Sequence, residues 1–235
     1  MMNIMRHFKD LGNDGKMAKW YDKNMREHRM SEMREYAEEV ARRIKNGSTV
    51  LEIAPGPGYL SIELAKLGDY EIVGLDISKD FVEIAARNAR ASGVNVVFRQ
   101  GNVVDIPFPD ESFDFIVCSA AFKNFKEPLR ALTEMCRVLK SHGKALIIDL
   151  DRDISNREIH KFTKEMGVKG IEALFMEMTF KYFLRRGAYT RNGFIKYLTA
   201  TPFKGYDIKK EGLTLHVYLQ KLSSTGSVEI YETIS

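Results

Sequence analysis

Apolar residues follow two spacings along this chain, and the two spacings alternate. Between residues 49 and 150, short apolar runs are separated by segments whose apolar residues recur every three or four positions. The runs predict strands at 50–54, 71–75, 96–98, 113–118 and 145–150. Strands that alternate with helices of this length predict βαβ units, which build a parallel sheet covered on both faces.

Residues with known roles at helix ends mark the helices between these strands. A helix is expected at 59–67, closed by Gly68, and a second one is expected to begin after Ser78 and to end before Gly93. Pro128 stands where a first-turn proline belongs, and Leu129, Leu132, Cys136 and Leu139 share one helical face after it. We expect this third helix to continue until Gly143.

The pattern changes on both sides of this central part. Residues 1–48 predict an N-terminal helical cap, residues 49–150 a ligand-binding core, and residues 151–205, which have no clear strand, a helical lid insertion. Residues 206–222 predict two antiparallel strands joined by Gly212, and 223–235 a tail. The expected fold is therefore Rossmann-like α/β, with a mostly parallel seven-stranded sheet, helices on both faces and an antiparallel C-terminal hairpin.

Composition narrows the class of protein. Apolar residues make up 44% of the chain and charged residues 29%, which is typical of globular proteins. No run of about 18 apolar residues and no apolar leader segment is present, so neither a membrane span nor a signal peptide is expected. Two cysteines do not form a disulfide framework, which favours the cytoplasm. A net charge of +4 is too mild to indicate nucleic acid, and the oligomeric state stays open.

A glycine turn follows the first predicted strand. It reads Ala54-Pro55-Gly56-Pro57-Gly58, and its glycines let the backbone approach a ligand closely at the start of a helix. Asp76 ends the second predicted strand, 18 residues after Gly58, where a carboxylate can accept hydrogen bonds from both hydroxyls of a ribose. The competing interpretation is that Asp76 only caps the helix that follows.

Two residues near the turn distinguish a dinucleotide ligand from a cationic one. A dinucleotide fingerprint needs glycine or alanine at its third position, where this chain has Ser61. Glu52 would repel the two phosphates of a dinucleotide but would attract a cation. S-adenosylmethionine (SAM) carries a sulfonium and an ammonium, so the turn favours SAM over NAD.

These residues belong to four ordered blocks. They are 50–58, 73–78, a third block of 101–103 with 106–110 and 112–114, and 137–140 before Gly143. Together they resemble the class I SAM-dependent methyltransferases, and most closely in type the ubiquinone/menaquinone-biosynthesis C-methyltransferases (UbiE-like, methyltransferase type 11). The resemblance covers nearly half of the chain. It implies a transferase that uses SAM, releases S-adenosylhomocysteine and acts on a small molecule.

The resemblance also implies a role for each matched residue. Residues of the turn would pack on the methionine part of SAM with Glu52 near its ammonium, and Asp76 would hold the ribose. Ile77 would pack on the adenine, while Asn102 and the backbone of Val103 would hydrogen-bond it, and Ser119 and Ala120 would lie beside the sulfonium. The full set of predicted cofactor residues is Glu52, Ala54, Pro55, Gly56, Gly58, Asp76, Ile77, Ser78, Gly101, Asn102, Val103, Ser119 and Ala120.

The acceptor site is less marked in the sequence. Phe122 and Asn124 follow the fourth predicted strand and are candidates for substrate contacts, as is the N-terminal Tyr21. Methyl transfer needs mainly positioning, but a nucleophile that must lose a proton needs a base, and His160 and Tyr21 are the candidates. The acceptor is expected to be aromatic or lipid-like, and no metal is expected. A protein or peptide methyltransferase and a non-catalytic SAM-binding regulator are the alternatives.

Overall fold

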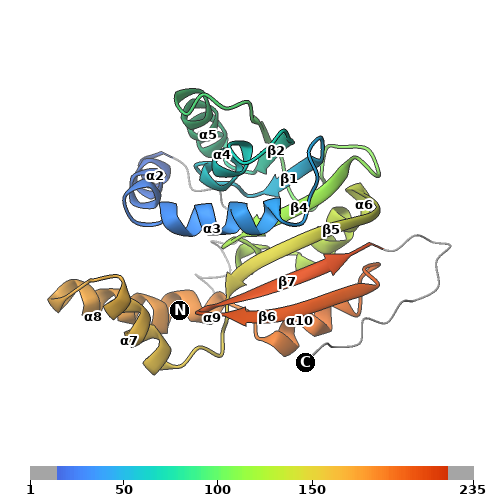
Figure 1. Cartoon of the computed structure of the whole chain (residues 1–235). Coiled ribbons are helices and arrows are strands. Elements are labelled where there is room, and N and C mark those ends of the chain that lie inside the picture. Colours follow the sequence, from blue (N-terminus) through green and yellow to red (C-terminus); the bar gives the residue numbers. More distant parts are fainter. Residues whose placement is uncertain (1–14, 222–235) are drawn as a thin grey trace.

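The computed structural model describes residues 15–221, and one seven-stranded sheet forms its centre (Figure 1). The strand order is β3-β2-β1-β4-β5-β7-β6. The first five strands pair in parallel, and β7 runs antiparallel to β5 and β6. The expected fold class is confirmed. The strands are β1 (Thr49–Ile53), β2 (Glu71–Asp76), β3 (Val97–Gln100), β4 (Phe113–Ser119), β5 (Leu139–Leu150), β6 (Gly205–Glu211) and β7 (Thr214–Gln220).

Helices cover both faces of the sheet because its central strands are apolar on both sides. On β1, Val50 packs in one hydrophobic cluster and Leu51 and Ile53 pack in the other. The Val50 cluster includes side chains of the helices α3 and α4, and the Leu51 cluster includes side chains of α6 and α10. The helices before residue 150 are α2 (Lys16–His28), α3 (Met30–Ala41), α4 (Tyr59–Ala65), α5 (Lys79–Ala91) and α6 (Pro128–Val138).

The segment between β5 and β6 is helical, and its first two helices extend from one end of the sheet (Figure 1). A capping box formed by Ser155 and Glu158 begins the first of them. The elements are α7 (Asn156–Glu165), α8 (Gly170–Thr179), the π-helical turn η2 (Phe180–Leu184), α9 (Arg185–Gly187) and α10 (Arg191–Leu198). None of the described helices is long and apolar enough to cross a membrane.

The predicted end of the third helix is wrong. The third predicted helix does not reach Gly143, because α6 ends at Val138 and Leu139 already begins β5 in an extended conformation. Leu139 pairs with Phe113 of β4, so strand pairing takes over from the helical pattern there. His142 therefore lies within β5, in a left-handed conformation with φ of 63°, and not at a helix end.

The N-terminal part also differs in detail from the expected continuous helix. The backbone breaks at Arg29, which separates α2 from α3, and α3 ends at Ala41, before the predicted stop at Asn46-Gly47. The predicted tail, residues 223–235, and the first 14 residues of the predicted cap lie outside the described residues.

Candidate cofactor site

The site is built where β1, β2 and β4 end, because neighbouring parallel strands bring their carboxyl ends to one edge of the sheet. The glycine turn after β1 leads directly into α4, whose N-cap is Gly58 with φ of 81°. A Cβ atom at Gly58 would lie 2.7 Å from the Phe98 ring and 2.9 Å from Ala85. Glycine is thus required at this position by the packing of the turn on β3 and α5, besides any contact with a ligand.

Asp76 ties the turn to the end of β2. It is buried, and its Oδ2 atom accepts a hydrogen bond of 3.0 Å from the Gly56 N–H. Its Oδ1 atom accepts one of 2.9 Å from the Ser78 N–H, and the Ser78 hydroxyl caps α5 by accepting from the Phe81 N–H. Asp76 therefore orients both the glycine turn and the start of α5.

Glu52 is a buried carboxyl group on the face of β1 that α3 and α4 cover. It is 2% exposed and accepts hydrogen bonds from the backbone N–H of Ser61, at 3.0 Å, and from the Ser61 hydroxyl. Burial raises the pKa of Glu52 to about 7, and the nearby charge of Asp76 adds to this effect. A cation bound next to Glu52 would stabilise its ionised form.

Two alanines at strand ends have left-handed backbones. Ala54 follows β1 with φ of 54°, and Ala120 follows β4 with φ of 56°. Each is held in place by a backbone hydrogen bond to the next strand, from Ala54 N–H to Leu75 O at 2.8 Å and from Ala120 N–H to Ile148 O at 2.7 Å. Such a conformation costs about 1–2 kcal/mol for a non-glycine residue and is concentrated at functional sites.

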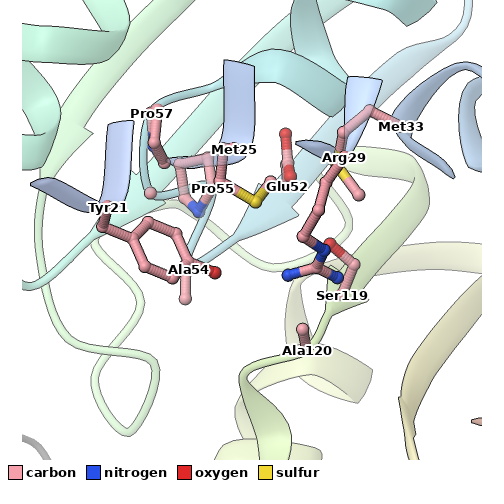
Figure 2. A pocket seen from close by; sticks show the side chains of 11 residues that line it. Tyr21, Met25, Arg29, Met33, Glu52, Ala54, Pro55, Pro57, Ser119 and Ala120 are labelled. Atoms are coloured by element: carbon pink, nitrogen blue, oxygen red, sulfur yellow. The ribbon is translucent and has the colours of Figure 1, made fainter. Parts of the chain in front are cut away.

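A cavity of about 30 Å³ lies between these loops and the N-terminal helices (Figure 2). Two methionines and an aromatic ring from α2 and α3 form its cover, while the strand ends form its floor. In Figure 2 the Arg29 side chain extends toward Ser119 and Ala120. The lining residues are Tyr21, Met25, Arg29, Met33, Glu52, Ala54, Pro55, Gly56, Pro57, Ser119 and Ala120.

Arg29 is fixed by α3, although it lies in the break before that helix. Its guanidinium donates to both oxygens of Glu32, at 2.7 and 2.6 Å, and the Tyr36 hydroxyl also donates to Glu32 at 2.9 Å. This two-point pairing holds the planar guanidinium rigidly. A positive charge therefore faces the cavity beside the end of β4.

A second ion pair fixes the loop after β4. The Lys123 ammonium lies 2.9 Å from the buried Asp149 carboxylate and also donates to the Ala120 carbonyl. The Lys123 backbone N–H donates to the same carboxylate at 2.8 Å. Lys123 thereby connects the left-handed turn at Ala120 to Asp149 on β5.

Comparison with known proteins agrees with this geometry. Residues 51–147 match the family model described as a methyltransferase domain. The chain thus resembles a methyltransferase domain over a segment that is less than half of its length. The resemblance predicted from the four sequence blocks is confirmed, and these blocks lie almost entirely within the matched residues.

Several curated proteins resemble part of the chain. The chain is 40% identical over 101 residues to YcgJ of Bacillus subtilis, an uncharacterized methyltransferase, covering 43% of this chain and 40% of YcgJ. It is 35% identical over 101 residues to the demethylmenaquinone methyltransferase of Deinococcus radiodurans, covering 43% and 42% of the two chains. The chain thus covers less than half the length of each of these relatives.

Solved structures resemble a larger part of the chain. One is a protein of Methanococcus maripaludis, provisionally described as a SAM-dependent methyltransferase, with a TM-score of 0.76 and 26% identity over 89% of this chain and 94% of that one. Another, a SAM-dependent methyltransferase of Aquifex aeolicus, has a TM-score of 0.60 and 21% identity over 82% and 98% of the two chains. The second likeness concerns the fold alone.

The residues predicted to hold adenine do not line the cavity. They follow β2 and β3, where Ile77 is 37% exposed and Val103 is buried. Asn102 accepts a hydrogen bond of 3.2 Å from the Val104 N–H, and the Gly101 N–H donates to the Asp76 carbonyl at 2.9 Å. The loops after β2 and β3 are therefore connected through Asp76.

Of the predicted acceptor and catalytic residues, Tyr21 lines the cavity. Phe122 is fully buried in an aromatic cluster and packs on Phe194, with ring centroids 5.3 Å apart. Asn124 is exposed after β4, and His160 is an exposed residue of α7 whose Nδ1 lies 2.7 Å from Glu177. The structure does not bring these three side chains into the cavity.

Some cavity residues were missed by the sequence interpretation. Arg29, Met25 and Met33 lie on predicted helices without any motif, and nothing in their spacing distinguishes a cover from an ordinary packed face. Ser61 was interpreted only as a departure from a dinucleotide fingerprint. The structure shows a different role, because Ser61 binds the Glu52 carboxyl group.

Proposed function

We propose that this protein transfers the methyl group of SAM to a small-molecule acceptor. The observation that carries the proposal is the meeting of the glycine turn, Asp76 and Glu52 at one edge of a methyltransferase domain. A turn that approaches a ligand, a carboxylate for ribose hydroxyls and a buried carboxyl group for a cation match the three chemically distinct parts of SAM.

The chain offers a partner for each part of this cofactor. Asp76 would accept hydrogen bonds from the ribose, and Ile77 and Asn102 would contact the adenine. Glu52 would face the positive methionine part. Arg29 supplies the opposite charge beside Ser119, which suits the methionine carboxylate or an anionic group of the acceptor.

The cover over the cavity must move for this ligand to enter. A space of about 30 Å³ holds about one water molecule, whereas SAM is a nucleoside joined to an amino acid. Met25 and Met33 of the cover are flexible side chains that adapt to different occupants. We infer that α2 shifts away from the strand ends on binding and closes again over the cofactor.

Methyl transfer requires the protein mainly to position the acceptor and to exclude water. Bound SAM supplies a methyl group already activated by positive sulfur, so its transfer is an in-line displacement. The residues at the end of β4 would position the acceptor, and closure of α2 would exclude water. The Tyr21 hydroxyl is the group of the cavity cover that could orient or deprotonate an acceptor.

The acceptor is proposed to be aromatic or lipid-like. The support is the apolar cover formed by Tyr21, Met25 and Met33, together with the similarity to a demethylmenaquinone methyltransferase. A narrow cavity under a helix also favours a small molecule over nucleic acid or polypeptide. Two buried free thiols, Cys118 and Cys136, support a location in the reducing cytoplasm.

Calorimetry with SAM and S-adenosylhomocysteine tests cofactor binding directly. Asp76→Asn should weaken both ligands, whereas Asp69→Asn, which changes an exposed carboxylate, serves as the matched control. Incubation with methyl-labelled SAM and a cell extract then tests transfer. Label in extractable small molecules supports the proposal, label in macromolecules supports the polypeptide alternative, and binding without any transfer indicates a regulator.

A further inference from the structure

A polar cluster lies apart from the cofactor cavity, where α3 packs over the C-terminal strands. Glu39 of α3 and His216 of β7 are 7% and 3% exposed, and Glu211 stands beside them at the end of β6. The His216 Nδ1 atom lies 3.0 Å from Glu39 Oε2 and 3.9 Å from Glu211 Oε2. All three candidate ligand atoms lie within 4.8 Å of one another.

The hydrogen bonds of Thr214 indicate the tautomer of His216. The Thr214 hydroxyl donates to the Glu211 carbonyl at 2.9 Å, so its oxygen must accept in the 3.1 Å contact with His216 Nε2. Nε2 therefore carries a proton, and in a neutral ring the Nδ1 atom presents a lone pair. That lone pair points into the cluster with the two carboxylates.

The Nδ1 atom needs a positive partner. It is buried and makes no hydrogen bond of regular geometry among residues 15–221, although it lies 3.0 Å from the Glu39 Oε2 atom. A lone pair that faces a carboxylate oxygen at this distance is repelled by it. A cation bound between the two atoms would remove the repulsion and satisfy both.

Neighbouring groups orient the Glu39 carboxylate toward this point. Its Oε1 atom accepts a hydrogen bond of 2.6 Å from the Tyr218 hydroxyl and lies 3.4 Å from the Arg43 guanidinium. Arg43 is itself fixed by the Glu39 carbonyl and by the Tyr218 ring. Oε2 is therefore the oxygen left to face His216, and outer hydrogen bonds of this kind are typical of metal ligands.

We propose that Glu39, His216 and Glu211 bind a divalent transition-metal ion, for which zinc is the best match. Tetrahedral zinc at about 2.0–2.2 Å from its ligands places the ligand atoms about 3.4 Å apart. The two distances from Nδ1, 3.0 and 3.9 Å, bracket this value, and the half-exposed Glu211 side chain can turn inward. A fourth position then opens to water.

The surroundings give the ion access from solvent. The three ligands line a polar cleft of about 570 Å³ between α3 and the β6–β7 hairpin. Arg42, Arg43 and Lys209 also line it, so the cleft carries positive as well as negative charge. Three protein ligands with an open fourth position toward a cleft are the arrangement of a zinc site that exchanges its water.

Calorimetry of the full chain without an affinity tag, stripped of metal by a chelator and titrated with zinc chloride, tests the proposal. We expect one zinc ion per chain. Glu211→Gln should weaken zinc binding about ten-fold or more without disturbing the fold, because its side chain is 54% exposed. Cobalt substituted for zinc should give the visible absorption of a tetrahedral site with nitrogen and oxygen ligands, and His216→Gln should abolish it.

Two variants serve as controls for the loss of a carboxylate or a histidine elsewhere in the chain. Glu35→Gln removes another acidic side chain of the same cleft, and His160→Gln removes an exposed histidine that is paired with a carboxylate. Both variants should bind zinc as tightly as the unmodified protein. The proposal is overturned if the unmodified protein binds no zinc, or if Glu211→Gln binds it no more weakly than Glu35→Gln.

Discussion

The buried Glu52 carboxyl group should make the stability of the ligand-free protein depend on pH. Its pKa of about 7 in the folded protein compares with an ordinary value of 4.5. At 1.36 kcal/mol per pH unit this difference corresponds to about 3 kcal/mol. Because the folded state holds the proton more tightly, this stabilisation is complete below pH 4.5 and is lost as the pH rises through 7.

The variant Glu52→Gln isolates this effect, because glutamine still accepts a hydrogen bond from Ser61 but does not ionise. Urea unfolding of both proteins at several pH values gives the difference in their free energies of unfolding. From pH 5 to pH 8 the unmodified protein should lose about 2.5 kcal/mol relative to the variant. A difference that stays constant within about 0.5 kcal/mol would refute the reasoning, since Glu52 would then titrate normally.

Three further measurements test Glu52, Gly58 and Asp76 of the site. If SAM places its positive charge beside Glu52, SAM affinity measured by calorimetry should rise about 15-fold from pH 5.5 to 7.0, and Glu52→Gln should lose this dependence. Gly58→Ala should lower the free energy of unfolding in urea by about 2–4 kcal/mol, because its Cβ would meet the Phe98 ring at a positive φ; an unchanged midpoint would contradict this. Asp76→Asn should weaken SAM about 10- to 100-fold in calorimetry, since a charged acceptor for the ribose is lost, and equal affinity would argue against ribose binding.

The sequence predicts the sheet well because burial on both faces leaves a strong local pattern. Val50, Leu51 and Ile53 are apolar whichever side they face, so the strand can be recognised without its neighbours. The end of α6 is predicted wrongly because no local pattern marks it. Leu139 continues the helical apolar face, and only its pairing with Phe113 of a distant strand extends the chain there.

The floor of the site could be predicted from the sequence, whereas its cover could not. The glycine turn and Asp76 stand at fixed positions relative to strand ends, so their meeting follows from the parallel pairing of β1 and β2. Arg29 reaches the cavity only because the backbone breaks between α2 and α3 and because Glu32 holds its guanidinium. The break and the ion pair are local, but the packing of this segment over the ends of β1 and β4 is a tertiary contact that residue spacing does not encode.

The contact between Tyr218 and Glu39 has a consequence for the synthesis of the chain. The two residues are 179 positions apart, and α3, which carries Glu39, also carries part of the cavity cover. At about 5–20 residues per second, a ribosome needs about 10–40 s to reach Tyr218 after Glu39. Throughout that interval α3 lacks its partner, and once β5 (Leu139–Leu150) has been made its edge stays exposed until β7 follows. A nascent chain would therefore complete the packing around α3 only after β7 has been made.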